Sequence, residues 1–378
     1  MEKPKVRISV RNLVEFILRS GDLDNSRGSS GDKEAMLKGG RLHRKIQRSM
    51  KGNYQAEVSL KRESEYEDTI IQVEGRADGI FTEDGEVWID EIKGTYGNLQ
   101  AMEMPVPVHR AQAMCYGWIY GEKEGLSQIG IQMTYSHLDT EDTRRFREIF
   151  SMEELKKWYQ ELLDAYHKWI AYSLSWKKER NASMTDLQFP FPYREGQREI
   201  VSGVYHTVSS KKTLFVQAPT GVGKTMSAIF PSVRAIGEGK GETLFYLTAK
   251  TITGTVAWEA FHTLRENGLK FKVTAITAKE KLCFLDSPEC TPEKCPYAKG
   301  HFDRVNDAVY ELWTTEEVYS REVIRAHAEK WQVCPFEMCL DLSVWVDGVI
   351  CDYNYAFDPN VHLKPVSYTH LRAHETLR

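Results

Sequence analysis

Two carboxylates and a lysine lie close together in the sequence, in a pattern that could hydrolyse a phosphodiester. In the strand-like stretch VWIDEIKG, Glu91 and Lys93 share one face of the strand, while Asp90 points the other way. Asp78, near the end of the preceding strand, can meet Glu91 across a hairpin. Such an oxygen-rich site suits Mg²⁺ or Mn²⁺, which activates water, and the lysine can stabilise the transition state or orient the water.

Three further residues could complete this site. His43, on a helix expected over 33–50, could add a neutral imidazole to the metal shell. Gln112 and Tyr116 lie four positions apart, and therefore on one face of a helix expected over 109–121. Taken singly, each feature has an ordinary alternative: a surface hairpin with solvated charges, a structural histidine, or a plain helix surface.

Together and in this order, these residues resemble the RecB-like branch of the PD-(D/E)XK nucleases, over roughly residues 9–150. The resemblance implies a metal-dependent DNA nuclease with His43, Asp78 and Glu91 as metal ligands and Lys93 as catalytic base or stabiliser. Gln112 and Tyr116 fall where that family has a DNA-contacting motif. Related CRISPR-associated nucleases also hold an iron–sulfur cluster with four cysteines. This half of the chain contains only Cys115, so it departs from them in that respect.

A glycine-rich motif, APTGVGKT, follows in the second half and predicts a phosphate-binding loop. Gly221 and Gly223 allow backbone N–H groups to surround phosphates, and the positive end of the next helix adds to the attraction. Lys224 would reach the β- and γ-phosphates of ATP, and Thr225 would reach Mg²⁺. The stretch LFVQ before the motif is strand-like, and the stretch after it is helical. The candidate residues are Ala218, Pro219, Thr220, Gly221, Val222, Gly223, Lys224 and Thr225.

Two flanking stretches indicate what kind of ATPase this motif could serve. The stretch FPYREGQ resembles the segment with which superfamily 2 helicases read adenine, at Arg194 and Gln197. The stretch LFYLTAKT (244–251) resembles the strand and threonine loop that touch the DNA backbone in those motors. The resemblance implies ATP as the nucleotide and single-stranded DNA, or DNA with single-stranded ends, as the partner.

Cys283, Cys290, Cys295 and Cys334 lie between the phosphate-loop motif and VICDYNYAFDP. That order resembles the XPD/DinG branch of helicases, which inserts a four-cysteine [4Fe–4S] domain at this point, and thiolates suit such clusters. Cysteines 290/295 and 334/339 also form two evenly spaced pairs, so a tetrahedral zinc site is an alternative. Reduced thiols without a metal are a third.

These residues must be positioned by an α/β fold in two parts. The expected first domain, 1–180, is a mixed sheet flanked by helices, in which strands over 54–61, 69–81, 86–94, 128–138 and 144–150 alternate with helices. Ser9 is the expected N-cap of a helix over 10–20, and a long helix over 153–180 closes this part. A polar, proline-containing stretch then leads to a RecA-like parallel-sheet domain over 186–365, with the cysteine-rich insertion at about 280–340.

The composition is ordinary for a globular protein: 378 residues, 41% hydrophobic and 28% charged, with a net charge of −4. Any nucleic-acid-binding surface must therefore be local. No apolar run approaches the length of about 20 residues needed to span a membrane, and there is no signal peptide. We expect a cytoplasmic protein without a membrane partner, and the sequence gives no oligomeric state. In such a protein, seven cysteines indicate metal ligands or buried thiols rather than disulfides.

The last residues, VSYTHLRAHETLR (366–378), have neither a strand pattern nor paired acids. They resemble a translated sequencing adapter, and a genuine solvated tail is the alternative. The acidic DEAH box that follows DYNY in XPD/DinG proteins is missing before this tail. We therefore expect a fragment of a nuclease–helicase fusion acting in DNA repair or recombination, in which the fragment itself has no helicase activity. The alternatives are a first half that is a non-catalytic DNA clamp, and a phosphate-loop ATPase unrelated to DNA.

Overall fold

The computed structural model describes residues 3–24, 32–50, 52–249 and 251–358. The expected non-native tail, 366–378, lies outside the described residues. The contacts divide the chain into two compact units. The first contains residues 1–20 and 25–169, and the second contains 21–24 and 170–378. The division falls inside a long helix rather than at the polar stretch near 186, and four residues from near the N-terminus belong to the second unit.

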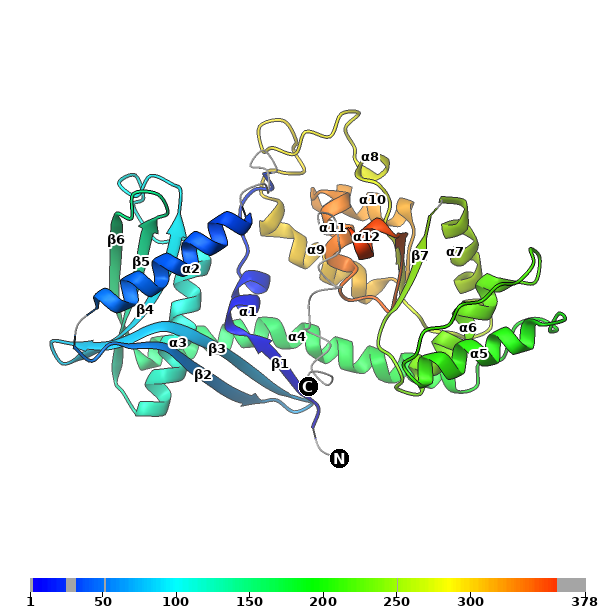
Figure 1. Ribbon diagram of the computed structural model, residues 1–378, viewed down its shortest axis with the longest axis horizontal. Coiled ribbons are helices and arrows are strands. Elements are labelled where there is room, and N and C mark those ends of the chain that lie inside the picture. Colours follow the sequence, from blue (N-terminus) through cyan, green and yellow to red (C-terminus); the bar gives the residue numbers. More distant parts are fainter. Residues whose placement is uncertain (1–2, 25–31, 51, 250, 359–378) are drawn as a thin grey trace. The chain divides into compact units, whose positions relative to one another are not determined.

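A six-stranded mixed sheet forms the centre of the first unit (Figure 1). The strands run in the order β1-β3-β4-β5-β6, with β2 paired to β3. The β1–β3 and β4–β5 pairs are parallel, and the other pairs are antiparallel. The elements are β1 (Lys5–Ser9), α1 (Val10–Ile17), α2 (Asp32–Ser49), β2 (Gln55–Glu65), β3 (Ile70–Glu83), β4 (Glu86–Thr95), α3 (Pro107–Glu124), β5 (Gln128–His137), β6 (Thr143–Ser151) and α4 (Met152–Thr185).

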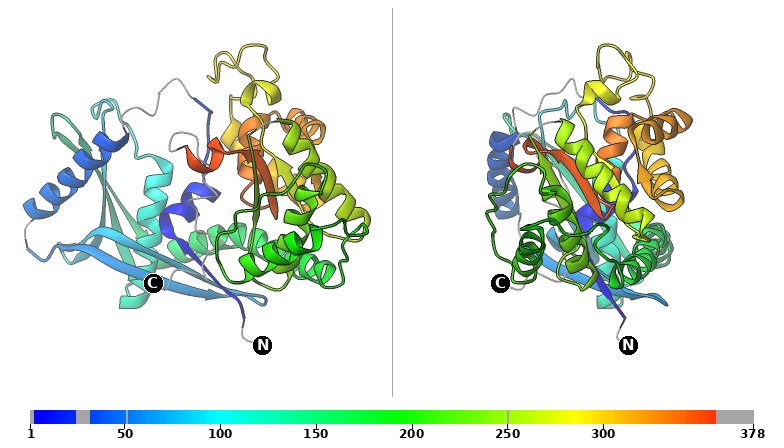
Figure 2. Two further views of the ribbon diagram at one scale, coloured as in Figure 1. Left: turned by 45° about the vertical axis from the view of Figure 1, so that its right-hand side comes forward. Right: turned by 90° about the vertical axis from the view of Figure 1, so that its right-hand side faces the viewer.

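Local sequence signals account for much of this unit. Ser9 caps α1, as predicted, because its hydroxyl accepts a hydrogen bond from the backbone N–H of Asn12 at 3.1 Å. The β3–β4 hairpin turns at Asp84 and Gly85, whose φ angles of 52° and 84° match the left-handed turn that an Asp-Gly pair favours. Consecutive residues of β4 contact different helices: Ile92 packs against α2, and Lys93 contacts α3. The two helices lie on opposite sides of the sheet (Figure 2, left).

A four-stranded parallel sheet, in the order β7-β10-β8-β9, forms the second unit together with helices around it. Helices α5 and α6 pack side by side (Figures 1 and 2). The elements are α5 (Gln197–Ser209), α6 (Lys224–Gly237), β7 (Leu244–Thr248), α7 (Thr251–Glu266), β8 (Val273–Ala275), α8 (Lys279–Leu282), α9 (His301–Thr315), β9 (Val318–Tyr319), α10 (Arg321–Trp331), α11 (Pro335–Leu342), β10 (Gly348–Asp352) and α12 (Asn354–Phe357).

The strand expected over LFVQ (214–217) is wrong for the structure as described. These residues form no strand, and Phe215 is 93% exposed. A strand requires backbone partners, and within the described residues no strand pairs with this stretch. The α/β fold class itself, with one mixed and one parallel sheet, is as predicted. Among the described residues, no helix is both long enough and apolar enough to cross a membrane.

Candidate functional site

Asp78 lies where the pairing between β3 and β4 ends. The last paired residues are Gly79 and Asp90, and beyond them β4 continues to pair only with β5. The Asp78 carboxylate accepts a hydrogen bond from the backbone N–H of Ile92 at 2.7 Å, and so takes the place of the missing strand partner. Its other oxygen faces His43 Nδ1 on α2 at 3.6 Å. The structure therefore brings two of the three predicted metal ligands together.

A connected row of polar side chains runs from Glu91 to α3. Lys93 Nζ lies 2.7 Å from Glu91 Oε1, as expected for two residues on the same face of a strand. The same ammonium group donates to Gln112 Oε1 at 3.1 Å, and Gln112 Nε2 donates to the Tyr116 hydroxyl at 3.4 Å. Four of the six residues that the sequence predicts for one site are thus in sequential contact.

The carboxyl group of Glu91 is buried and only partly satisfied. Its side chain is 2% exposed, and Oε2 has no hydrogen-bond partner. Burial and the charge of Asp78 raise the pKa of Glu91 to about 8, although Lys93 acts in the opposite direction. An unpartnered buried carboxylate oxygen beside a second carboxylate is chemically suited to a divalent cation. As the side chains stand, however, no group of three or more His, Cys, Asp or Glu residues in the described chain is placed to hold a metal ion.

Asp90, the acidic neighbour of Glu91, points to the opposite face, as strand alternation predicts. It is fully buried and accepts hydrogen bonds from Thr134 Oγ1 at 2.6 Å, Gln132 Nε2 at 3.0 Å and the Tyr54 hydroxyl at 3.1 Å. Burial raises the pKa of Asp90, although these three donors oppose the shift. This network was not predicted from the sequence, because its members come from three separate segments.

The phosphate-loop motif forms a tight turn before α6. Gly221 and Gly223 have φ angles of 87° and 82°, a left-handed conformation that glycine adopts without strain. Lys224, the first residue of α6, donates from Nζ to the carbonyl oxygens of Ala218 and Pro219, at 2.8 Å each. The lysine thus folds back over its own loop, and a phosphate group would compete with these two carbonyls for it.

The structure brings Arg194 and Gln197 to this loop. The Arg194 guanidinium donates to the carbonyl oxygen of Gly221, and the Arg194 backbone N–H donates to Gln197 Oε1 at 3.0 Å. Gln197 is buried against Gly223, where an added Cβ would lie 2.5 Å from the Gln197 amide nitrogen. A side chain at position 223 would therefore displace Gln197 as well as strain the loop.

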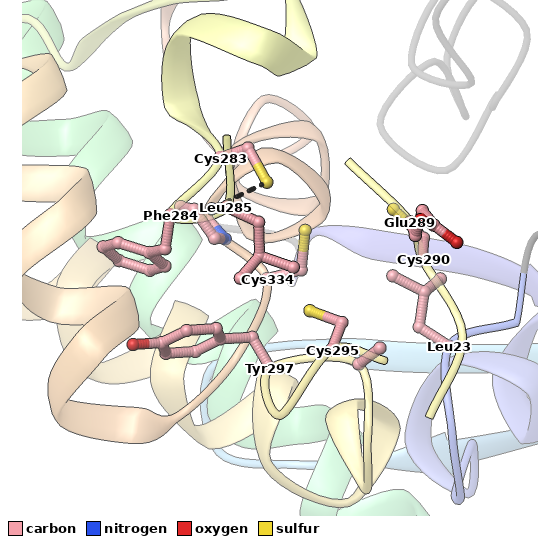
Figure 3. A pocket seen from close by; sticks show the side chains of 11 residues that line it. Leu23, Cys283, Phe284, Leu285, Glu289, Cys290, Cys295, Tyr297 and Cys334 are labelled. Carbon is pink, nitrogen blue, oxygen red and sulfur yellow. Dashed lines mark hydrogen bonds between the residues drawn. The ribbon is translucent and has the colours of Figure 1, made fainter. Parts of the chain in front are cut away.

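The four predicted cysteines of the second unit line one cavity (Figure 3). The sulfur atoms of Cys283, Cys290, Cys295 and Cys334 face the same space. Cys339 lies apart from them, buried with its sulfur 3.6 Å from Thr274 Oγ1. The cavity is thus lined by the four cysteines of the predicted set and not by Cys339. As their side chains stand, these cysteines are among the described residues that form no group able to hold a metal ion.

Charged groups around this cavity were not anticipated from the sequence. Burial raises the pKa of the Cys334 thiol to about 12, and nearby Lys279 partly opposes that shift. Although burial disfavours its ammonium form, the pKa of Lys279 is raised by a hydrogen bond to Cys290 and by the charge of Glu337. Arg325 donates to the carbonyl oxygens of Leu282 and Cys283, at 2.7 and 2.8 Å, and so fixes the segment that carries the first cysteine.

Comparisons with known proteins find similarity over short or loosely matching regions. No family model matches the chain. A probable ATP-dependent helicase of Methanocaldococcus jannaschii is 40% identical over 47 residues, which are 12% of this chain and 7% of the relative. The alignment therefore spans less than a tenth of that helicase.

Two solved structures also match. The structure of SSO0001 gives a TM-score of 0.29 at 20% identity, over 43% of this chain and 78% of that one. A truncated XPD gives 0.27 at 12% identity, over 44% and 47% of the two chains. TM-scores this low do not by themselves establish a shared fold.

Proposed function

We propose that this chain combines parts of an ATP-dependent DNA helicase with a metal-dependent DNA nuclease that acts in DNA repair or recombination. The observation that carries the nuclease half is the connected row Glu91–Lys93–Gln112–Tyr116 beside Asp78 and His43. The short identity with a probable ATP-dependent helicase, together with the geometry of the phosphate loop, supports the motor half.

In the nuclease half, Asp78, Glu91 and His43 are the residues that would hold Mg²⁺ or Mn²⁺. Such a cation would lower the pKa of a bound water and neutralise charge on the phosphodiester. Lys93 is held between Glu91 and Gln112, so that its ammonium group is oriented before substrate arrives. It is positioned to donate to a phosphate oxygen as negative charge develops there, or to orient the attacking water.

In the motor half, ATP would bind with its phosphates at the loop over 218–225. Its β- and γ-phosphates would replace the Ala218 and Pro219 carbonyls as partners of Lys224. Arg194 and Gln197 are the residues proposed to read adenine, and their contacts with Gly221 and Gly223 would link the base to the phosphate loop.

For the cysteine cavity we propose a [4Fe–4S] cluster held by Cys283, Cys290, Cys295 and Cys334. The four sulfurs surround one space, and the cavity's apolar wall, which includes Leu23, Tyr297 and Ala298, would limit access of water. Zinc is the alternative metal that the same thiols could bind. Iron, sulfide and zinc analysis of protein purified without oxygen distinguishes the two.

The nuclease proposal is tested by cleavage of linear single-stranded DNA in Mn²⁺. We expect Glu91→Gln to lower the cleavage rate by a factor of about 10³ or more, because it removes a ligand oxygen from the reacting centre. Glutamine has the shape of protonated Glu91, the form that burial favours, so the variant should fold. Glu86→Gln is the matched control, since Glu86 lies at the other end of β4 and hydrogen-bonds to Gln128.

Each remaining outcome identifies a different function. Tight DNA binding by the wild type, without any metal-dependent cleavage, would support a non-catalytic clamp. ATP turnover that single-stranded DNA does not stimulate, in a preparation with the full motor, would support an ATPase unrelated to DNA. Cleavage by Glu91→Gln at the wild-type rate would show that the nuclease site has been misassigned.

A further inference from the structure

A short segment from near the N-terminus is built into the cysteine site. Residues 21–24 belong to the second unit, whereas the chain on both sides of them belongs to the first. They contact the turn that follows Cys295, at a distance of about 280 residues along the sequence. The contact joins two parts of the chain that no local interaction brings together, and specific hydrogen bonds hold it.

Four hydrogen bonds join this segment to the turn. Two are between backbone groups: Leu23 N–H to the Ala298 carbonyl at 2.8 Å, and Phe302 N–H to the Gly21 carbonyl at 2.9 Å. Two more are reciprocal bonds to carboxylates: the Gly300 N–H donates to Asp22 at 2.6 Å, and the Gly21 N–H donates to Asp303 at 2.8 Å. The turn is therefore held from both ends by the segment.

Leu23 is the apolar part of the same contact. Its side chain is 6% exposed and packs in one cluster with Cys295, Ala298 and Cys334. It also lines the cavity that the four cysteines surround (Figure 3). A leucine in this place reduces the solvent access of the cavity, and solvent access is one of the factors that set the stability and potential of a thiolate-bound centre.

We propose that segment 21–24 is part of the four-cysteine site: its hydrogen bonds position the turn that follows Cys295, and Leu23 closes the cavity. This inference rests on the cysteine site proposed above. A metal centre bound by the thiols would stabilise the same arrangement of the turn as the docked segment does. Binding of the metal centre and docking of the segment are therefore reciprocally coupled. Release of the metal centre should loosen the segment, and disruption of the segment should speed release of the metal centre.

The experiment uses the full chain as purified without oxygen and compares Leu23→Asp with Leu37→Asp, a substitution at a leucine that is 66% exposed. Loss of iron, or of zinc, to a chelator is followed with time. We expect Leu23→Asp to lose the metal about 10-fold faster or more, and Leu37→Asp to behave as the wild type. Asp22→Ala, which removes the bond to Gly300 without burying a charge, should also speed the loss.

Hydrogen exchange of the backbone over 18–24 gives the converse measurement. Exchange in the wild type should rise when the metal is removed, because the segment is then held less firmly. Equal metal loss in Leu23→Asp, Asp22→Ala and wild type, or exchange that does not respond to metal removal, would overturn the proposal.

A wild type that contains neither iron nor zinc would overturn the proposed cofactor, and the role of the segment would still be decided by thiol reactivity. Cys295 and Cys334 are each 7% exposed. Faster modification of these two thiols by an aromatic disulfide in Leu23→Asp than in Leu37→Asp would support the segment as the cover of the cavity. Equal rates would refute it.

Discussion

Asp90 and Glu91 are adjacent residues of β4 with opposite surroundings. Asp90 has three hydrogen-bond donors, whereas Glu91 has one carboxylate oxygen without a partner and a raised pKa. The difference follows from the strand's alternation, which sends one carboxylate into a satisfied network and the other toward α3. In the proposed nuclease, Glu91 is therefore the carboxylate available to a metal ion, and Asp90 is not.

Asp90→Ala should lower the free energy of unfolding by about 1–3 kcal/mol, because it leaves the buried donors of Thr134, Gln132 and Tyr54 without an acceptor. Glu91→Gln should change it by less than about 1 kcal/mol, since glutamine matches the protonated acid. Urea unfolding at pH 7 without divalent cations measures both. A larger loss in Glu91→Gln than in Asp90→Ala would contradict this assignment of roles.

At the scale of secondary-structure elements, the position of α3 depends on how closely it can pack against the sheet. A Cβ added at Gly75 of β3 would lie 2.7 Å from the Tyr116 hydroxyl, so the absence of a side chain there allows α3 to pack closely. Tyr116 then contacts Gln112, which orients Lys93. The position of a helix thus determines the position of a lysine one strand away.

Gly75→Ala should displace Tyr116 and reduce DNA cleavage, at a cost of about 1–3 kcal/mol in stability. Gly39→Ala is the matched control, because Gly39 lies inside α2 with nothing within 4 Å of an added Cβ. There alanine should stabilise the protein by about 0.5–1 kcal/mol and leave cleavage unchanged. Cleavage rates and thermal unfolding of the two variants provide the comparison, and equal behaviour would argue against the packing role of Gly75.

Lys272, which immediately precedes β8, should make a pH-dependent contribution to the stability of the protein. Its ammonium group is buried and donates to the carbonyl oxygens of Trp313 and Glu316, at 2.6 and 2.5 Å. Burial lowers the pKa of Lys272 to about 8, from 10.5 for the unfolded side chain, although nearby carboxylates oppose the shift. Between these values the unfolded chain binds more protons, so this residue's contribution to stability rises with pH.

The free energy of unfolding of the wild type, minus that of Lys272→Met, should therefore increase from pH 8 to pH 10.5. Subtracting the variant removes the effect of tyrosines and other lysines that titrate in the same range. Guanidinium unfolding at half-unit pH intervals measures the difference. A difference that stays constant or falls over this window would show that the pKa of Lys272 is not lowered in the folded protein.

Structural features that depend on residues close together in the sequence were predicted better than features that depend on contacts between distant segments. The Asp-Gly hairpin, the Ser9 cap and the pairing of Glu91 with Lys93 follow from turn chemistry and strand alternation, and the structure has all three. The prediction of a strand at 214–217 was wrong, because a strand forms only where a neighbouring strand pairs with it. The contact of Leu23 with the cysteine cavity was not predicted, because nothing in four residues near the N-terminus specifies a partner so distant in sequence.

At the scale of the whole molecule, the two proposed activities use residues of different compact units. Lys224→Ala should lower the affinity for ATP by about 10-fold or more, because the lysine is the cation that meets the phosphates. It should leave Mn²⁺-dependent cleavage unchanged, and Glu91→Gln should leave ATP affinity unchanged. A fluorescent ATP analogue and labelled single-stranded DNA measure the two in parallel. A change in both activities from either substitution would show that the sites are coupled.

The exposed stretch at 214–217 has a consequence for handling the protein. Leu214, Phe215 and Val216 are 41%, 93% and 44% exposed, in a run of backbone that pairs with no described strand. An exposed apolar segment without a strand partner is a template for adding a strand from another molecule. We therefore expect concentrated solutions of this chain to self-associate through β-pairing at this stretch, with the phosphate loop only a few residues away.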